Sequence, residues 1–220
     1  MPSIWYGPVS ASDPPRQGEL VRDCPVIQWR EDAGSDGGEA DPLAWVKDAA
    51  EDSDRITSTV RAEACDLIVL TNSCDIAQHN VPLVLLCPAH DVTDYCAAWL
   101  AGRSDKSGHK GAWRTRCTEI QRGRTQNLTV LGVGNGSEAD EGDGTDYRVV
   151  DFSEPYTLPL AVLKRHLHVT THTRICLLPP YCEHLSQAFA RYHMRVGLPT
   201  SVPDNFGEEA LASALTDGSQ

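Results

Sequence analysis

Short apolar runs separated by polar turns follow one another along most of the chain, a pattern that predicts several short strands. The clearest is Asp66 to Thr71, whose aliphatic and β-branched residues are too few for a helix and are bounded by polar residues. The segment 19–30 is expected to form one bent strand or two short ones, with Pro25 at an edge or a bulge. Further strands are expected at 81–87, at 127–133, at 147–152 and at 174–178.

Apolar residues at helical spacing predict the helices. The strongest pattern covers 181–196, where Gly197 ends the helix and Pro199 prevents its continuation. We also expect a helix at 41–50, which the Asp41-Pro42 pair would begin, and another at 91–101. A further helix is expected to start with Thr157 as its N-cap, because Leu160, Leu163 and Leu167 then repeat at helical spacing. The basic stretch 103–124 has no clear pattern.

These elements predict an α+β fold, a small curved β-sheet or barrel with three to four peripheral helices. A parallel doubly wound sheet is the alternative. With 220 residues the chain has the length of one domain. We expect a flexible arm at 1–17, a single α+β domain at 18–203 and an acidic mobile tail at 204–220. The sequence contains no glycine-rich phosphate-binding motif.

The formal net charge of -12 works against a broad surface for nucleic-acid phosphates. Much of the negative charge lies in the segments 31–41 and 138–146 and in the tail, so we expect the folded body to be closer to neutral. Few of the 19 basic residues are lysines, which favours a bacterial source with GC-rich DNA.

No apolar run approaches the roughly 20 residues that a bilayer-spanning helix requires, so we expect no contact with a membrane. The N-terminus has neither the basic nor the apolar region of a secretory signal, and a cytoplasmic location is expected. The eight cysteines are scattered, which favours reduced thiols over a disulfide framework.

The first candidate site is the turn that follows the clearest strand, because sites often lie at strand ends. Cys74 is a candidate nucleophile and Asp75 its polar partner, while Thr71, Asn72 and Ser73 are candidates for substrate binding. The alternative is structural: these side chains cap a turn or a helix by bonding to the main chain.

The second candidate is the polar edge of the helix at 181–196. Residues at spacings of three and four share one helix face, which indicates that His184, Gln187, Arg191 and Arg195 lie together. If this face borders the turn, His184 and Arg191 would be catalytic, and Gln187 and Arg195 would bind substrate. The alternative is an ordinary solvated face.

Two further groups of residues could bind ligands. Cys74, His79, Cys87 and His90 lie close in sequence, as do Cys176, Cys182 and His184, but neither group has the paired spacing typical of zinc sites. We therefore predict no metal and no other cofactor. A basic patch around Trp113 contains Arg114, Arg116, Arg122 and Arg124, and would either contact RNA or an acidic partner or pair with the chain's own carboxylates.

The order of features resembles that of the MazF/PemK-type toxins. The resemblance rests on the Gly-x-Leu-Val opening at 18–21, the strand at 67–70, the strand that ends in Cys87-Pro88-Ala89, and the late helix. It implies an SH3-like barrel and metal-free cleavage of single-stranded RNA. The chain has Ala64-Cys65-Asp66 where that family has an Arg-Pro pair, so the resemblance supports the fold more than the function.

Two classes of function follow. The first is an intracellular bacterial protein of toxin-antitoxin or defence-system type that acts on RNA through the polar strand-end site. The second is a non-catalytic subunit that binds a protein partner. The sequence leaves open whether the chain is an enzyme.

Overall fold

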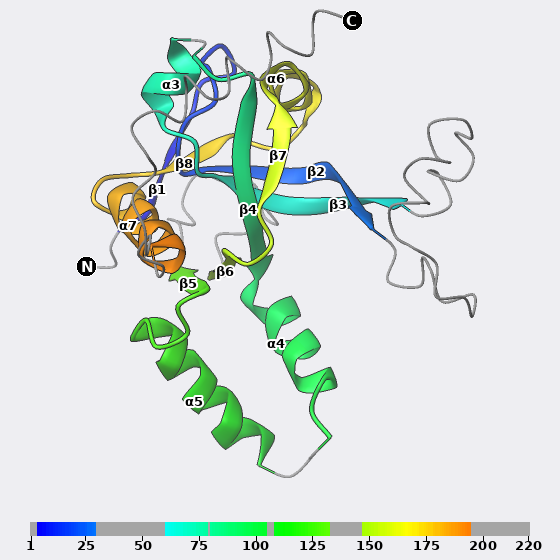
Figure 1. The fold of residues 1–220 in the computed structure, drawn as a ribbon, viewed down its shortest axis with the longest axis vertical. Coiled ribbons are helices and arrows are strands. Elements are labelled where there is room, and N and C mark those ends of the chain that lie inside the picture. Colours follow the sequence, from blue (N-terminus) through cyan, green and yellow to red (C-terminus); the bar gives the residue numbers. More distant parts are fainter. Residues whose placement is uncertain (1–3, 30–59, 79, 105–107, 133–146, 195–220) are drawn as a thin grey trace, which may run out of the picture.

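The computed structural model describes residues 4–29, 60–78, 80–104, 108–132 and 147–194. Within them, an eight-stranded antiparallel sheet curves through the molecule without closing into a barrel, and five helices surround it (Figure 1). The prediction of an α+β fold with a curved sheet is confirmed, and the doubly wound parallel alternative is excluded. The helix expected at 41–50 and the tail at 204–220 lie outside the described residues.

The strands are β1 (Tyr6–Pro8), β2 (Glu19–Trp29), β3 (Val60–Val69), β4 (Leu83–Asp91), β5 (Leu128–Leu131), β6 (Arg148–Asp151), β7 (Tyr156–Pro159) and β8 (Ile175–Leu177). Their order in the sheet is β1-β8-β2-β3-β4-β6-β5, and β7 pairs with β4 beside this path. The helices are α3 (Ser73–Ala77), α4 (Val92–Ala101), α5 (His109–Gln121), α6 (Leu160–Val169) and α7 (Tyr181–His193).

The sheet bends where β2 carries a bulge between Val21 and Cys24. Asp23 has a φ of 48°, a left-handed conformation that aspartate tolerates better than most residues, and its main-chain N–H donates to Asp66 Oδ1 at 3.0 Å. Pro25, expected at an edge or bulge, stands in the ladder opposite Ala64 just after this bulge.

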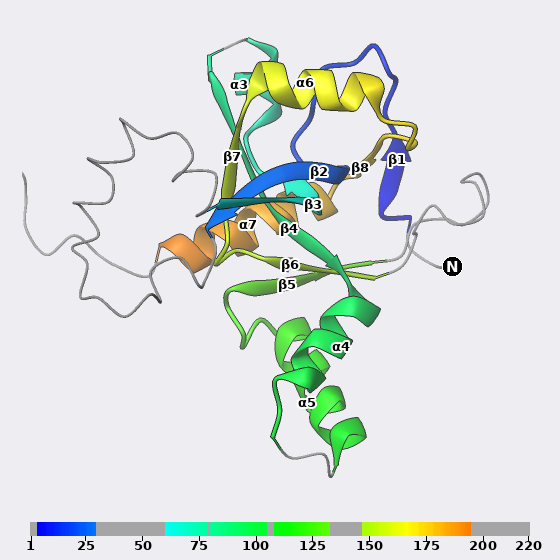
Figure 2. The same ribbon diagram turned by 90° about the vertical axis from the view of Figure 1, so that its right-hand side faces the viewer.

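Helices cover the sheet on two sides (Figure 2). Leu160, Leu163 and Leu167 of α6 are buried among residues of β2, β3 and β4, so the leucine spacing seen in the sequence does mark a core-facing stripe. Leu185 and Ala188 of α7 pack on a second cluster with Ile68 and Phe152. Each fully buried leucine contributes roughly 1.5–3 kcal/mol of transfer free energy. The two clusters fix α6 and α7 against the sheet.

The predicted start of α6 is wrong. Thr157 does not cap a helix but lies in β7, opposite Leu85 of β4, and the helix begins at Leu160. Tyr156 and Thr157 both favour extended structure, and an available partner strand outweighed the capping preference of one threonine. Helices α3 and α5 were not predicted, so the described residues contain more helices than expected.

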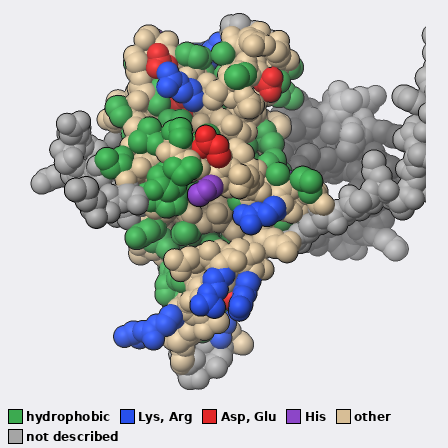
Figure 3. Space-filling model, turned by 90° about the vertical axis from the view of Figure 1, so that its left-hand side faces the viewer, with side chains coloured by type: hydrophobic (Ala, Val, Ile, Leu, Met, Phe, Trp, Pro, Cys, Tyr) green, Lys and Arg blue, Asp and Glu red, His purple; other side chains and the backbone are tan. Residues whose placement is uncertain are grey.

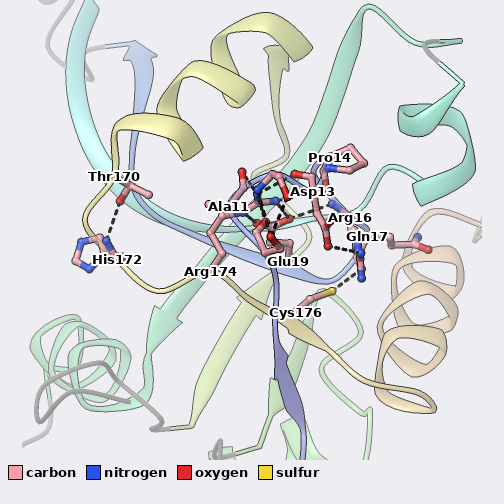
Figure 4. Close-up of polar contacts among 12 residues, drawn as sticks. Ala11, Asp13, Pro14, Arg16, Gln17, Glu19, Thr170, His172, Arg174 and Cys176 are labelled. Atoms are coloured by element: carbon pink, nitrogen blue, oxygen red, sulfur yellow. Dashed lines mark hydrogen bonds and ion pairs between the residues drawn. The ribbon is translucent and has the colours of Figure 1, made fainter. Parts of the chain in front are cut away.

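The segment expected to be an arm, 1–17, contributes strand β1 and is held by Arg174 (Figure 4). The Arg174 guanidinium pairs with Glu19 through Nε to Oε1 at 2.6 Å and Nη2 to Oε2 at 3.0 Å. It also donates to main-chain carbonyls of residues 10, 11, 13 and 14. We call Gln17, Glu19 and Arg174, with the groups they bind, the polar junction.

None of the described helices combines the length and the apolar character that a membrane-spanning segment requires.

Candidate functional site

The turn at 71–75 is built from side chains that bond to the main chain. Asn72 is the N-cap of α3 and its Oδ1 accepts from Cys74 N at 2.8 Å. Thr71 Oγ1 accepts from Leu85 N at 2.7 Å, and Ser73 Oγ accepts from Gln17 N at 2.9 Å. Thr71 and Ser73 therefore hold the turn against β4 and the polar junction, and Asn72 caps the helix within the turn.

The other two candidates are more accessible. Cys74 is exposed and Asp75 is half-buried in the first turn of α3. His79, which the sequence placed beside them, lies outside the described residues, as does Arg195. Cys87 is fully buried, and burial raises the pKa of its thiol to about 12, as expected of a core residue. No group of three or more metal-binding side chains is found in the described part of the chain.

The polar face predicted on the last helix exists and borders a groove. His184, Gln187 and Arg191 all line a groove of about 350 Å³ between α7 and β5, with Thr129 and Leu131 on its other wall. All three α7 side chains are exposed. The groove contains no residue of the turn at 71–75, so the sequence correctly grouped these three residues but the structure does not join them to that turn.

A second hollow extends this groove toward α5. It measures about 510 Å³ and shares Thr129, Ala188 and Arg191 with the first, and its far end is formed by Arg122 and Gln126. We call the two together the α7–β5 groove. Its polar lining consists of arginine, glutamine, threonine and histidine side chains, which are hydrogen-bond donors or neutral groups rather than carboxylates.

Two aromatic rings close the other end of the groove. Trp5 stacks on Tyr181 with ring centroids 3.8 Å apart and planes inclined by 16°. The indole also lies against Gly132, where an added Cβ would stand 2.2 Å from it, so only glycine permits this approach. The sequence did not indicate this contact, because Trp5 and Gly132 are far apart along the chain.

The main chain of β5 contributes to the groove as well. β5 is the last strand in the sheet order among the described residues. Phe152 N donates to Asn127 O, so alternate residues of β5 bond to β6 and Val130 directs its N–H and C=O away from β6. The edge of the strand thus presents hydrogen-bonding groups beside α7.

The predicted basic patch lies on α5 and on the turn that follows it, and α5 forms a helical hairpin with α4 that projects from the sheet (Figure 1). Arg116 bonds to Tyr95 Oη at 2.9 Å and to Thr125 Oγ1. Arg114, Arg122 and Arg124 are exposed, and within the described residues none of them forms an ion pair with a carboxylate. Figure 3 shows Lys and Arg side chains gathered on this hairpin.

The charge of the described residues differs from that of the whole chain. They contain 14 of the 19 Lys and Arg residues but only 12 of the 31 Asp and Glu residues. The expectation that the folded body is closer to neutral is therefore confirmed for this part. Among the described residues, no carboxylate pairs with the exposed arginines of α5 and the groove, which favours an anionic ligand there.

No family of known proteins, no curated protein and no solved structure matches this chain. The resemblance to MazF/PemK-type toxins therefore stays a prediction.

Proposed function

We propose that this protein binds single-stranded RNA in the α7–β5 groove. The observation that carries the proposal is the groove itself, in which Arg122 and Arg191 stand without carboxylate partners in the described structure and the rings of Trp5 and Tyr181 form one end. Proteins that bind single strands combine a basic channel for the phosphates with aromatic rings for the bases. A protein of toxin or defence-system type that acts on RNA needs such a surface.

The shape of the groove favours a single strand over a duplex. Its two hollows measure about 350 and 510 Å³, and their lining offers Gln187, Gln126 and the main chain of Val130 to unpaired base edges. Sequence-specific RNA recognition mostly targets unpaired bases, whose edges are exposed. We therefore expect a double helix, whose base edges are already paired, to bind more weakly than a single strand.

The turn at 71–75 is not needed for this binding. Asn72, Ser73 and Thr71 already accept hydrogen bonds from the main chain, and no groove residue comes from this turn. We therefore propose binding, and assign no catalytic step to Cys74, Asp75, His184 or Arg191. The alternative of a protein partner enters as an outcome of the test.

The test is fluorescence anisotropy of the full chain with a labelled single-stranded RNA of about 12 nucleotides. Replacing Arg122 and Arg191 by alanine should weaken binding about tenfold or more and reduce the slope of log K against log salt by about 1.4, because each single-strand phosphate contact contributes about 0.7. Arg165→Ala is the matched control, since Arg165 is an exposed arginine of α6 outside the groove.

The outcomes separate the two function classes. An RNA duplex of the same length should bind more weakly than the single strand. The proposal fails if poly-glutamate displaces the RNA when the two polymers are present at the same concentration of negative charge. It also fails if the wild-type chain does not bind RNA at all, and in both cases an acidic protein partner becomes the better hypothesis. Equal losses in the Arg165 and groove variants would also contradict it.

A further inference from the structure

Two thiols from different elements share one acceptor. Cys176 Sγ of β8 lies 3.2 Å from Gln17 O, and Cys182 Sγ of the first turn of α7 lies 3.3 Å from the same oxygen. Figure 4 shows the sulfur of Cys176 directed at Gln17. Because both sulfurs are within bonding distance of one atom, they are held as neighbours across the turn that connects β8 to α7.

The main chain beside them is closely packed. Gly18, with a φ of 80°, approaches so near that an added Cβ would stand 3.2 Å from Cys182 Sγ. Gln17 is itself fixed, since its N–H donates to Ser73 Oγ and its side chain donates to Leu70 O. The acceptor that gathers the two thiols therefore belongs to the rigid polar junction.

We propose that Cys176 and Cys182 are a disulfide-forming site that reacts with small-molecule disulfides of the glutathione class. A disulfide needs Cβ atoms about 3.5–4.5 Å apart. Because the two sulfurs already converge on one oxygen, closure requires rotation of both side chains together with a small shift of the short connection between β8 and α7. The inference is independent of the proposed RNA binding, because neither sulfur lines the groove.

The reaction is an exchange in two steps. The thiolate of Cys182 attacks one sulfur of oxidised glutathione, the glutathione S–S bond breaks, and one glutathione thiolate leaves and takes up a proton. The thiolate of Cys176 then attacks the Cys182 sulfur of this mixed disulfide and expels the second glutathione. The two cysteines are oxidised by two electrons in total, and one glutathione disulfide is reduced to two thiols.

The environments of the two thiols set the order and the pH dependence. Burial raises the pKa of Cys176 to about 12 and also raises the pKa of Cys182. The reactive species is the thiolate, so exchange should be slow at neutral pH and faster in mild alkali. Both thiols are half-buried, and Cys182, at the start of α7, is assigned as the thiol that attacks first.

Other cysteines provide internal comparisons. Cys24 faces Cys65 directly across β2 and β3, but Cys24 is fully buried and closed to a dissolved reagent. Cys74 is exposed. Cys74 should therefore stop at a mixed disulfide, whereas the Cys176 and Cys182 pair should proceed to closure.

The test is incubation of the native full chain with oxidised glutathione in mild alkali, followed by alkylation, trypsin digestion and mass spectrometry. Ile175 to Arg191 forms one tryptic peptide in which Cys176 and Cys182 are the two cysteines. We expect this peptide to lose the mass of two hydrogen atoms and to resist alkylation. A disulfide stabilises by restricting the unfolded chain, and the gain is modest because the closed loop is short. The oxidised protein should therefore melt roughly 5 °C higher.

Cys176→Ser is the informative variant, because serine keeps a donor for Gln17 O and so preserves the fold. In this variant Cys182 should stop as a glutathione adduct. The proposal is overturned if the wild-type peptide keeps two free thiols after Cys74 is fully converted, if it stops as a glutathione adduct, or if closure occurs only in denaturant.

Discussion

The polar junction and the α7–β5 groove both contain arginine, but they use it in opposite ways. Arg174 is 7% exposed and its guanidinium is surrounded by the Glu19 carboxylate and four main-chain carbonyls. Arg191 is exposed in the groove, and the described residues provide it with no ion pair. The first arginine is occupied by its own protein, and the second is available to a ligand.

This difference separates structural polar residues from candidate functional ones. A buried charge must be paired and hydrogen-bonded, because desolvation otherwise costs several kcal/mol. An exposed charge beside a hollow has no such requirement and keeps its capacity to bind. By this criterion the turn at 71–75 belongs with the junction, because Ser73 bonds to Gln17, and the groove stands apart.

The largest expected effect is at the junction. Arg174→Ala leaves Glu19, 0% exposed, as a buried carboxylate without its partner and should lower the free energy of unfolding by about 3–5 kcal/mol. Arg191→Ala removes only an exposed side chain and should change the free energy of unfolding by less than about 0.5 kcal/mol. Urea unfolding of both variants measures the contrast, and similar losses in the two would remove the distinction drawn here.

The second effect is alkaline sensitivity of the junction. Burial raises the pKa of Cys176 from 9.0 to about 12, so the folded state keeps a proton that the unfolded state releases above pH 9. The contribution of this thiol to the free energy of unfolding is fully present below pH 9. It is lost as the pH rises toward 12, by up to about 1.4 kcal/mol per pH unit.

Cys176→Ser removes this titration while keeping a donor for Gln17 O. Unfolding measured between pH 9 and 11 should show a shallower loss in this variant, whereas Arg191→Ala should retain the wild-type slope. An unchanged slope in Cys176→Ser would show that the thiol is not held protonated by the junction.

The smallest effect is at the turn. Asn72→Ala removes the N-cap of α3 and should cost about 1 kcal/mol, because Cys74 N loses its acceptor. Cys74 lies two residues further along the chain and is exposed, so Cys74→Ala should change the stability very little. Thermal unfolding of both variants is the measurement. A neutral Asn72 variant together with a destabilising Cys74 variant would reverse the roles assigned to them.

The fold was predictable where one face of an element is strongly apolar. Leu160, Leu163 and Leu167 marked α6, and the stripe through Leu185 and Ala188 marked α7. Helix α5 was missed because Ile120 is its one buried residue and its surface is basic. Strand β1 was missed because three residues next to prolines carry no pattern, and its pairing with β8 is long-range.

One wall of the α7–β5 groove was predictable from the sequence. Helical spacing places His184, Gln187 and Arg191 on one face, and they do line one groove. The opposite wall comes from β5 and from Trp5, which are far from α7 in the sequence and meet it only in the folded chain. No spacing in the sequence contains that information. The catalytic roles of His184 and Arg191 were predicted only on the condition that this face borders the turn at 71–75, and no residue of that turn lines the groove.

The most direct test of RNA binding in the groove is amide hydrogen exchange of the full chain with and without saturating single-stranded RNA. RNA bound in the groove should slow exchange in β5 at 128–131 and along α7 at 181–193, and should leave α3 at 73–77 unchanged. Protection centred on α3, with β5 and α7 unaffected, would contradict the account.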